Sequence, residues 1–287
     1  MPQDTDPADL QVTAADGQKV SARFFAPERE ARGAVLIIAA MGVGQDYYAP
    51  IARWLASEGF LAATFDYRGT GRSRPRTLRG FRADILDWAR LDCAAMIDAA
   101  SARAPGKRLY WLGHSLGGQI LPFVPNLERI AKVLTIAAGS GYWRENARPL
   151  RRYAWWLWFV AVPVATRLCG YFPGRRLRKV GDLPRGVIEQ WRRWCLDPQY
   201  AAGAEGARAR AEYAAVRTPI VSLAFADDEF MSARNTESLH ACYCNAPRIL
   251  KRIAPADIGV RRIGHFGFFR AAFADSLWRA QLLPELS

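Results

Sequence analysis

The sequence has few cysteines and lacks the features of a secreted chain. Its five cysteines stand at positions 93, 169, 195, 242 and 244, an odd number without any C-x-x-C pair. This usage is typical of a reduced, intracellular protein whose thiols serve as small apolar side chains. The opening residues MPQDTDPADL are polar and acidic, without the basic and apolar regions of a secretory signal. We therefore expect a cytoplasmic protein.

The apolar run YAWWLWFVAVPVA, residues 153–165, is too short to suggest a membrane span. It contains Pro163 and is flanked by Arg151, Arg152 and Arg167. A spanning helix needs about 20 apolar residues. We favour a buried or pocket-lining helix here, and the alternative is an interfacial helix that rests on lipid.

Negative charge is scarce in one segment of the chain. The net charge is +13, and residues 140–195 hold twelve Arg or Lys against three Asp or Glu, mostly arginines set among tryptophans. A basic excess can indicate nucleic acid, anionic lipid or an acidic substrate. Because the charge belongs to one aromatic segment, we do not expect nucleic acid as a partner. Peripheral contact with an anionic membrane, at its inner face, remains open.

Buried apolar runs and helical stretches alternate along the chain. The runs are 34–41, 60–67, 108–115, 131–138 and 218–230, with a last short strand near 248–253. Continuous apolar runs are typical of strands buried on both faces, and residues 81–103 have helical spacing. Alternation on both sides of Asp16-Gly17 predicts an antiparallel hairpin. The fold class is therefore α/β, a mostly parallel sheet with helices on both faces and an N-terminal antiparallel hairpin.

One long interruption, residues 139–217, is helical in character and rich in Trp and Arg. We interpret it as a helical cap inserted into a core formed by residues 1–138 and 218–287. Ligands of open α/β sheets bind at the carboxyl ends of the strands, so an insertion after a strand end would cover the site.

The stretch LYWLGHSLGG, residues 109–118, carries the strongest chemical signal. A strand runs into Gly113-His114-Ser115-Leu116-Gly117, which matches G-x-S-x-G at a strand-to-helix junction. Side chains two positions from the serine would collide with a neighbouring strand or helix, and Gly118 allows closer helix packing. Ser115 is thus a candidate nucleophile, and the N–H of Leu116 would face a developing oxyanion. The alternative is an ordinary glycine-rich turn.

A serine nucleophile needs a base, and the chain has only three histidines. His114 adjoins the serine and would project away from it, while His240 falls within a predicted helix as a surface or packing residue. His265 lies in RIGHFGFF, a glycine-flanked loop after the last strand, from which it could reach the same sheet edge. We predict His265 as the base.

The stretch LAFADDEF offers three carboxylates, Asp227, Asp228 and Glu229, at the end of a buried run. A carboxylate would fix the tautomer of the histidine. Asp228 is our choice, with Asp227 in reserve, and the alternative is that one or more of the three caps the following helix. The loop AAMGVG, residues 39–44, could supply a second oxyanion N–H. In DYRGTGRS we expect Asp66 and Arg68 to brace the loop.

With these motifs the chain resembles the α/β-hydrolase superfamily, within it the esterase and lipase branch that includes monoacylglycerol lipases and serine aminopeptidase-like proteins. The likeness covers nearly the whole chain outside the cap. It implies the α/β-hydrolase fold and an acid whose register falls on Asp228, with Phe225 in place of the family's glycine. Where the family reads His-Gly-x, this chain reads Ala39-Ala40-Met41. The resemblance therefore assigns the second oxyanion donor to the N–H of Met41.

The predicted function is a serine hydrolase that cleaves a carboxylic ester, thioester or amide through an acyl-enzyme, with no metal and no organic cofactor. The tryptophan-rich cap favours a small-molecule substrate with an apolar acyl portion, and the arginines would suit an anionic group. An acyltransferase would need the same residues, and a membrane-surface binding protein with vestigial catalysis is a further alternative. The sequence leaves the oligomeric state and the physiological substrate open.

Overall fold

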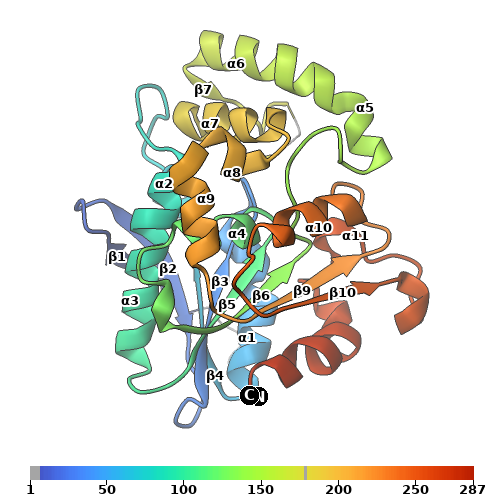
Figure 1. Ribbon diagram of the computed structural model, residues 1–287. Coiled ribbons are helices and arrows are strands. Elements are labelled where there is room, and N and C mark those ends of the chain that lie inside the picture. Colours follow the sequence, from blue (N-terminus) through green and yellow to red (C-terminus); the bar gives the residue numbers. More distant parts are fainter. Residues whose placement is uncertain (1–6, 178–179) are drawn as a thin grey trace.

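The computed structural model describes residues 7–177 and 180–287, and its centre is an eight-stranded sheet (Figure 1). The strand order is β1-β2-β4-β3-β5-β6-β9-β10. The strands are β1 Leu10–Thr13, β2 Lys19–Phe25, β3 Gly33–Ile38, β4 Phe60–Phe65, β5 Leu109–His114, β6 Ile130–Ile136, β9 Ile220–Phe225 and β10 Arg248–Ile253. Strands β1 and β2 are antiparallel to their neighbours, and all other pairs are parallel. The predicted fold class and hairpin are confirmed.

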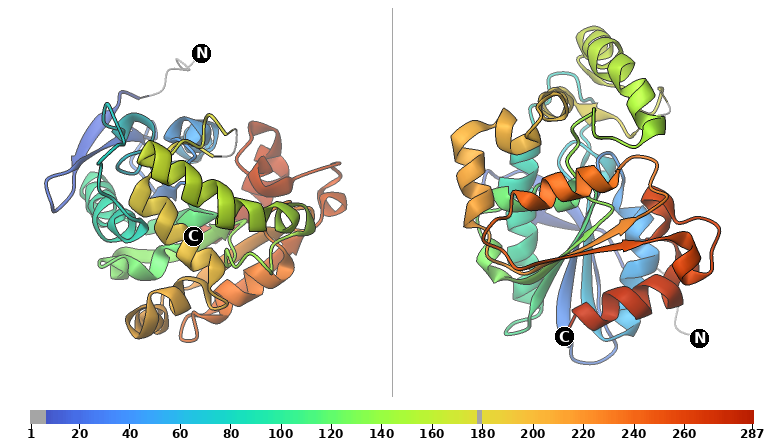
Figure 2. Two further views of the ribbon diagram at one scale, coloured as in Figure 1. Left: turned by 90° about the horizontal axis from the view of Figure 1, so that it is seen from above. Right: turned by 45° about the vertical axis from the view of Figure 1, so that its right-hand side comes forward.

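Helices cover both faces of this sheet (Figure 2). On one face α1, Ala49–Ser57, lies beside the C-terminal π-helical segment Ala274–Leu282, where the rings of Trp54 and Trp278 are 5.4 Å apart. On the other face α3, Ala94–Arg103, contacts several strands. The further core helices are α2 Ile85–Asp87, α4 Leu116–Gln119, α10 Ala233–Ala241 and α11 Gly264–Gly267.

The stretch 81–103 is not the single helix that its spacing predicts. Asp84 caps α2 by accepting the N–H of Asp87 at 2.8 Å, and a π-helical segment, Trp88–Cys93, joins α2 to α3. Within that segment the Asp92 carboxylate accepts hydrogen bonds from the backbone N and from Nε of Arg68, at 2.9 and 2.7 Å. The helix geometry thus places a buried carboxylate against the loop that follows β4.

The segment predicted as a cap carries five helices and a small sheet among the described residues. The helices are α5 Arg148–Trp156, α6 Val162–Cys169, α7 Arg185–Leu196, α8 Tyr200–Ala204 and α9 Gly206–Ala215, with a π-helical segment, Leu157–Ala161, between α5 and α6. Strands β7, Tyr171–Phe172, and β8, Leu183–Pro184, form an antiparallel pair that the sequence did not predict. Helices α5 and α6 are the outermost layer (Figure 1). Positions 1–6 of the predicted core and 178–179 of the predicted cap lie outside the described residues.

The apolar run in this outer layer does not form a membrane span. Across residues 7–177 and 180–287, no helix is long and apolar enough to cross a bilayer.

Candidate active site

Ser115 occupies a strained turn between β5 and α4. Its backbone φ of 50° and ψ of −110° lie in a region that residues other than glycine rarely adopt. The turn is held by hydrogen bonds from Ser115 N to Ile136 O and from Gly118 N to Ser115 O, both 2.9 Å long. Strain of this kind persists only where the surroundings enforce it, and it is frequent at functional sites.

The three glycines around Ser115 have no room for a side chain. A Cβ atom at Gly113 would lie 2.5 Å from the carbonyl oxygen of Gly117, and one at Gly117 would lie 2.3 Å from that of Ile38. A Cβ atom at Gly118 would lie 2.7 Å from the side chain of Ala138. These are the collisions with the adjoining helix and strands that the sequence predicts.

His265 and Asp228 form a hydrogen-bonded pair beside the serine. Nδ1 of His265 lies 2.9 Å from Oδ2 and 3.1 Å from Oδ1 of Asp228, and both side chains are buried. A carboxylate can only accept, so Nδ1 carries the proton and Nε2 is left without one in the neutral ring. Oδ1 of Asp228 also accepts the N–H groups of Phe230 and Met231, at 2.7 and 2.9 Å. The Asp228 carboxylate is therefore oriented by three donors.

The neighbouring carboxylates hold the backbone around the start of α11, since His265 lies in this short helix and not in the loop that the sequence predicts. Asp227 accepts the N–H groups of Ile263 and Gly264, at 2.8 and 3.1 Å, and Glu229 accepts that of His265 at 3.0 Å. Helix α10 is capped by Ser232 instead, whose side chain accepts the N–H of Asn235. The acidic run therefore anchors the start of α11, and Asp227 forms no hydrogen bond with the imidazole.

Met41 and Leu116, whose N–H groups are the predicted oxyanion donors, both lie near Ser115. Met41 follows β3 and lines the same cavity as Ser115, and Leu116 begins α4. Neither N–H donates a hydrogen bond to any residue that the structure describes. The loop is supported from the cap by Gly181, whose N–H donates to the carbonyl of Gly42 at 3.2 Å. Gly42 has a φ of +70°, and a Cβ atom there would lie 2.7 Å from Gly181 N.

A cavity of about 430 Å³ is lined by residues of both the predicted core and the predicted cap, and Ser115 and His265 are in its wall. Its lining is mostly apolar and comes from both parts of the chain. From the cap it includes Tyr153, Leu157, Trp158, Ile188 and Trp191. The Ser115 hydroxyl forms no hydrogen bond with a described residue.

The other two histidines are buried away from this cavity. Nδ1 of His114 lies 2.9 Å from the Tyr48 hydroxyl, and its Nε2 lies 3.0 Å from the carbonyl oxygen of His265. In α10, Nε2 of His240 lies 2.9 Å from Thr135 Oγ1 and its Nδ1 lies 2.7 Å from Thr236 O. His114 points away from the serine, as predicted, and His240 is a packing residue.

We expect His240 to make the stability of the protein sensitive to acid. Burial lowers its pKa from 6.5 to about 4. Below pH 6.5 the unfolded chain takes up a proton that the folded chain does not, so the free energy of unfolding falls until about pH 4. The loss is about 3 kcal/mol. Urea unfolding from pH 7 to pH 4 should show a steeper fall for the wild type than for His240→Gln, and parallel curves would contradict this account.

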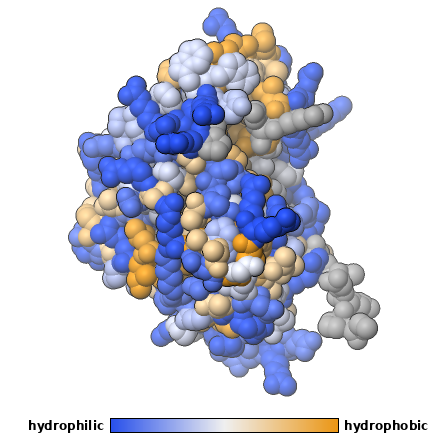
Figure 3. All heavy atoms as spheres, turned by 90° about the vertical axis from the view of Figure 1, so that its right-hand side faces the viewer, coloured by the Kyte–Doolittle hydropathy of each residue, from blue (hydrophilic) through white to orange (hydrophobic). Residues whose placement is uncertain are grey.

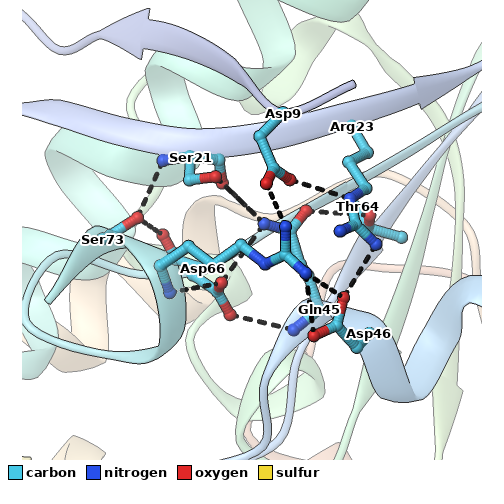
Figure 4. A network of polar contacts seen from close by, with 9 residues as sticks. Asp9, Ser21, Arg23, Gln45, Asp46, Thr64, Asp66 and Ser73 are labelled. Atoms are coloured by element: carbon cyan, nitrogen blue, oxygen red, sulfur yellow. Dashed lines mark hydrogen bonds and ion pairs between the residues drawn. The ribbon is translucent and has the colours of Figure 1, made fainter. Parts of the chain in front are cut away.

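Asp66 and Arg68 brace the loop that follows β4, as expected. The Asp66 carboxylate accepts the N–H groups of Gln45 and Arg72, both at 2.8 Å (Figure 4). Gly71 is required there, because a Cβ atom would lie 2.2 Å from the Asp66 carboxyl carbon. Arg68 pairs with Asp16 as well as with Asp92, so it joins the hairpin to the π-helical segment.

The site shows no sign of a metal centre within the ranges 7–177 and 180–287, where no group of three or more His, Cys, Asp or Glu is placed to hold an ion. Sequence reasoning missed the contacts of Tyr48 with His114 and of Glu229 with the His265 backbone. No local signal marks the first of these contacts. For Glu229, its place directly after Asp228 was the available signal.

The chain is similar in sequence to known hydrolases. Residues 29–168 match the family model of the serine aminopeptidases S33. Monoglyceride lipase of Saccharomyces cerevisiae is 30% identical over 115 residues, which cover 39% of this chain and 37% of the yeast protein.

Solved structures show the same fold. A soluble variant of that monoglyceride lipase, in complex with a substrate analog, has a TM-score of 0.65 at 18% identity and covers 88% of this chain and 87% of its own. An esterase of Pyrococcus furiosus has a TM-score of 0.61 at 14% identity, with coverage of 99% and 90%. By its sheet order and these structural likenesses, the chain has the α/β-hydrolase fold, and residues 29–168, just under half of it, match the serine aminopeptidase S33 model.

Proposed function

We propose that the protein hydrolyses carboxylic esters, with thioesters and amides as related substrates, through Ser115, His265 and Asp228. The observation that carries this proposal is that His265, which is hydrogen-bonded to Asp228, lies with Ser115 in the wall of a mostly apolar cavity. The serine hydrolases and esterases among the similar proteins support the same reaction class.

The proposed first step forms an acyl-enzyme. Ser115 Oγ attacks the substrate carbonyl carbon while Nε2 of His265 takes the hydroxyl proton, and Asp228 stabilises the imidazolium that results. The carbonyl oxygen becomes an oxyanion and accepts the N–H groups of Leu116 and Met41. One such donor contributes about 3–4 kcal/mol to lowering the barrier.

The first step ends when the bond between the carbonyl carbon and the leaving group breaks and His265 gives its proton to the leaving group. In the second step, which releases the acyl group, His265 takes a proton from a water molecule that attacks the acyl carbon. The ester bond to Ser115 breaks, and the serine recovers its proton from His265. With an alcohol in place of water the same sequence transfers the acyl group, so product analysis with added alcohols separates hydrolysis from acyl transfer.

We propose that the substrate is a small molecule with an apolar acyl group, because aromatic and aliphatic side chains line most of the cavity. A series of p-nitrophenyl esters from C2 to C12 tests this. We expect kcat/KM to rise with chain length, and Ile188→Phe to move the optimum to shorter chains by narrowing the cavity. Equal values from C2 to C12 would contradict the apolar pocket.

We further propose that the protein is cytoplasmic and that the outer layer of the cap, formed by α5, α6 and the segment between them, rests on the anionic inner face of a membrane. The exposed apolar side chains of this layer include Trp155, Trp156, Phe159 and Leu168, with 44–71% of their surface accessible. Exposed arginines at positions 148, 151, 152 and 167 flank them. Apolar and hydrophilic side chains mix at this end of the molecule (Figure 3). This combination is typical of interfacial helices on anionic lipid.

Helix α5 also forms part of the cavity wall. Its Tyr153 is exposed at the surface of the outer layer and lines the cavity as well. Lipid contact would therefore place the cavity beside the membrane. Flotation with phosphatidylglycerol-containing vesicles tests this: we expect binding at low salt, loss at 0.5 M salt, and loss in R151E/R152E but not in the α9 control R208E/R210E. Absence of flotation, or equal binding by both variants, would contradict the proposal.

A further inference from the structure

His114 occupies the first x position of G-x-S-x-G, and both nitrogen atoms of its ring form hydrogen bonds inside the protein. Its side chain has no accessible surface. The carbonyl oxygen of His265, 3.0 Å from Nε2, can only accept a hydrogen bond, so Nε2 carries the proton. Nδ1 is then an acceptor and receives the Tyr48 hydroxyl at 2.9 Å. The neutral Nε2–H tautomer of His114 is therefore fixed by its two partners.

The Tyr48 hydroxyl extends this network to the loop after β3. Tyr48 immediately precedes α1 and is 1% exposed. Its oxygen accepts the N–H of Ala40 at 2.9 Å while its proton is donated to His114. Hydrogen bonds thus run in one direction from Ala40 N–H through Tyr48 and His114 to the carbonyl of His265, and each donor has an acceptor.

Burial keeps this chain of hydrogen bonds in one protonation state. Removal from water lowers the pKa of His114 well below its ordinary value, and the nearby His265 ring lowers it further. Burial raises the pKa of the Tyr48 hydroxyl well above its ordinary value. Both side chains are therefore neutral at physiological pH, and the direction of the bonds is preserved.

From this arrangement we infer that Tyr48 and His114 are positioning residues, which set the place of the oxyanion donor relative to the catalytic base. Ala40 is the residue directly before Met41, and the carbonyl that His114 holds belongs to His265. Neither Tyr48 nor His114 is in the described wall of the cavity, so they act through Met41 and His265 and not on substrate. The inference rests on the proposed function of those two residues.

The variant Tyr48→Phe removes one oxygen atom and tests the inference. It leaves the N–H of Ala40 and Nδ1 of His114 without partners, which frees the loop that carries Met41. Removal of a whole oxyanion donor costs about 100- to 1,000-fold in kcat. We expect displacement of the donor to lower kcat about 10-fold, with KM unchanged within twofold.

The matched control is Tyr243→Phe. Tyr243 is also fully buried, and its hydroxyl donates to the backbone carbonyl of Gly118 at 3.4 Å, away from the oxyanion loop. We expect it to retain kcat within twofold. An unchanged kcat in folded Tyr48→Phe, with an active wild type, would overturn the positioning role alone. A wild type inactive on every ester would instead overturn the proposed function.

A spectroscopic measurement tests the network without relying on a variant that folds. In ¹⁵N NMR of the wild-type protein, we expect His114 to stay neutral, with the proton on Nε2, from pH 5 to pH 8. A His114 ring that titrates near pH 6.5, or that carries its proton on Nδ1, would overturn the inference even if Tyr48→Phe could not be purified.

Discussion

Replacement of Ser115 by alanine is expected to abolish ester hydrolysis, with a fall in kcat of about a million-fold. The reason is that the hydroxyl is the only group that the proposed mechanism uses as a nucleophile, and nothing else in that step replaces it. His265→Ala should cost a similar factor. The double variant should be no worse than either single one, because the two side chains act as a unit. Steady-state hydrolysis of a p-nitrophenyl ester measures all three.

Ser222→Ala is the matched control for this experiment. Ser222 is a fully buried serine of β9 whose hydroxyl has no hydrogen-bond partner among the described residues. We expect its variant to keep full activity and to be no less stable than the wild type, since an unpaired buried hydroxyl is unfavourable. Residual activity of Ser115→Ala above a few per cent would show that another residue attacks the substrate.

Replacement of Asp228 by asparagine should lower kcat about 10,000-fold. Asparagine has nearly the same shape, but its amide can present a donor to Nδ1 of His265, which turns the ring to the wrong tautomer. The carboxylate now lies 2.9 Å from Nδ1, so the effect acts directly on the base. Folding should be preserved, because the amide oxygen can still accept the N–H groups of Phe230 and Met231.

Asp227→Asn separates the two neighbouring acids. Asp227 accepts the N–H groups of Ile263 and Gly264 and does not contact the His265 ring. The asparagine oxygen can keep one of these bonds, so we expect a loss in kcat of less than 10-fold. Equal losses in Asp227→Asn and Asp228→Asn would contradict the assignment of the acid.

The strained turn at Ser115 and the contact between Asp228 and His265 were predictable from the sequence because local sterics and chain order determine them. Only glycine fits at positions 113 and 117, because a Cβ atom at either position would lie within 2.5 Å of a backbone oxygen atom. The hairpin at Asp16-Gly17 is equally local. Asp228 lies three residues beyond the end of β9 at Phe225, and its carboxylate meets His265 at that edge of the sheet.

The features that the sequence did not predict depend on contacts between distant residues. Tyr48 and His114 are 66 residues apart, and nothing near either residue marks their hydrogen bond. The π-helical segment Trp88–Cys93 has no local sequence signal that separates it from an ordinary helix, and its Asp92 contacts Arg68, 24 residues away in the chain. The strands β7 and β8 of the predicted cap have only two residues each. They are too short to show the alternation of apolar and polar residues that predicts a strand.

Reaction with a fluorophosphonate, followed by mass spectrometry of the digested protein, tests the central claim most directly. An activated serine attacks the phosphorus and forms a stable adduct, while ordinary serines do not react. The account predicts one adduct per chain, on the peptide that contains Ser115, and none in Ser115→Ala or His265→Ala. A wild-type protein that remains unlabelled, or a Ser115→Ala protein labelled as fast as the wild type, would contradict it.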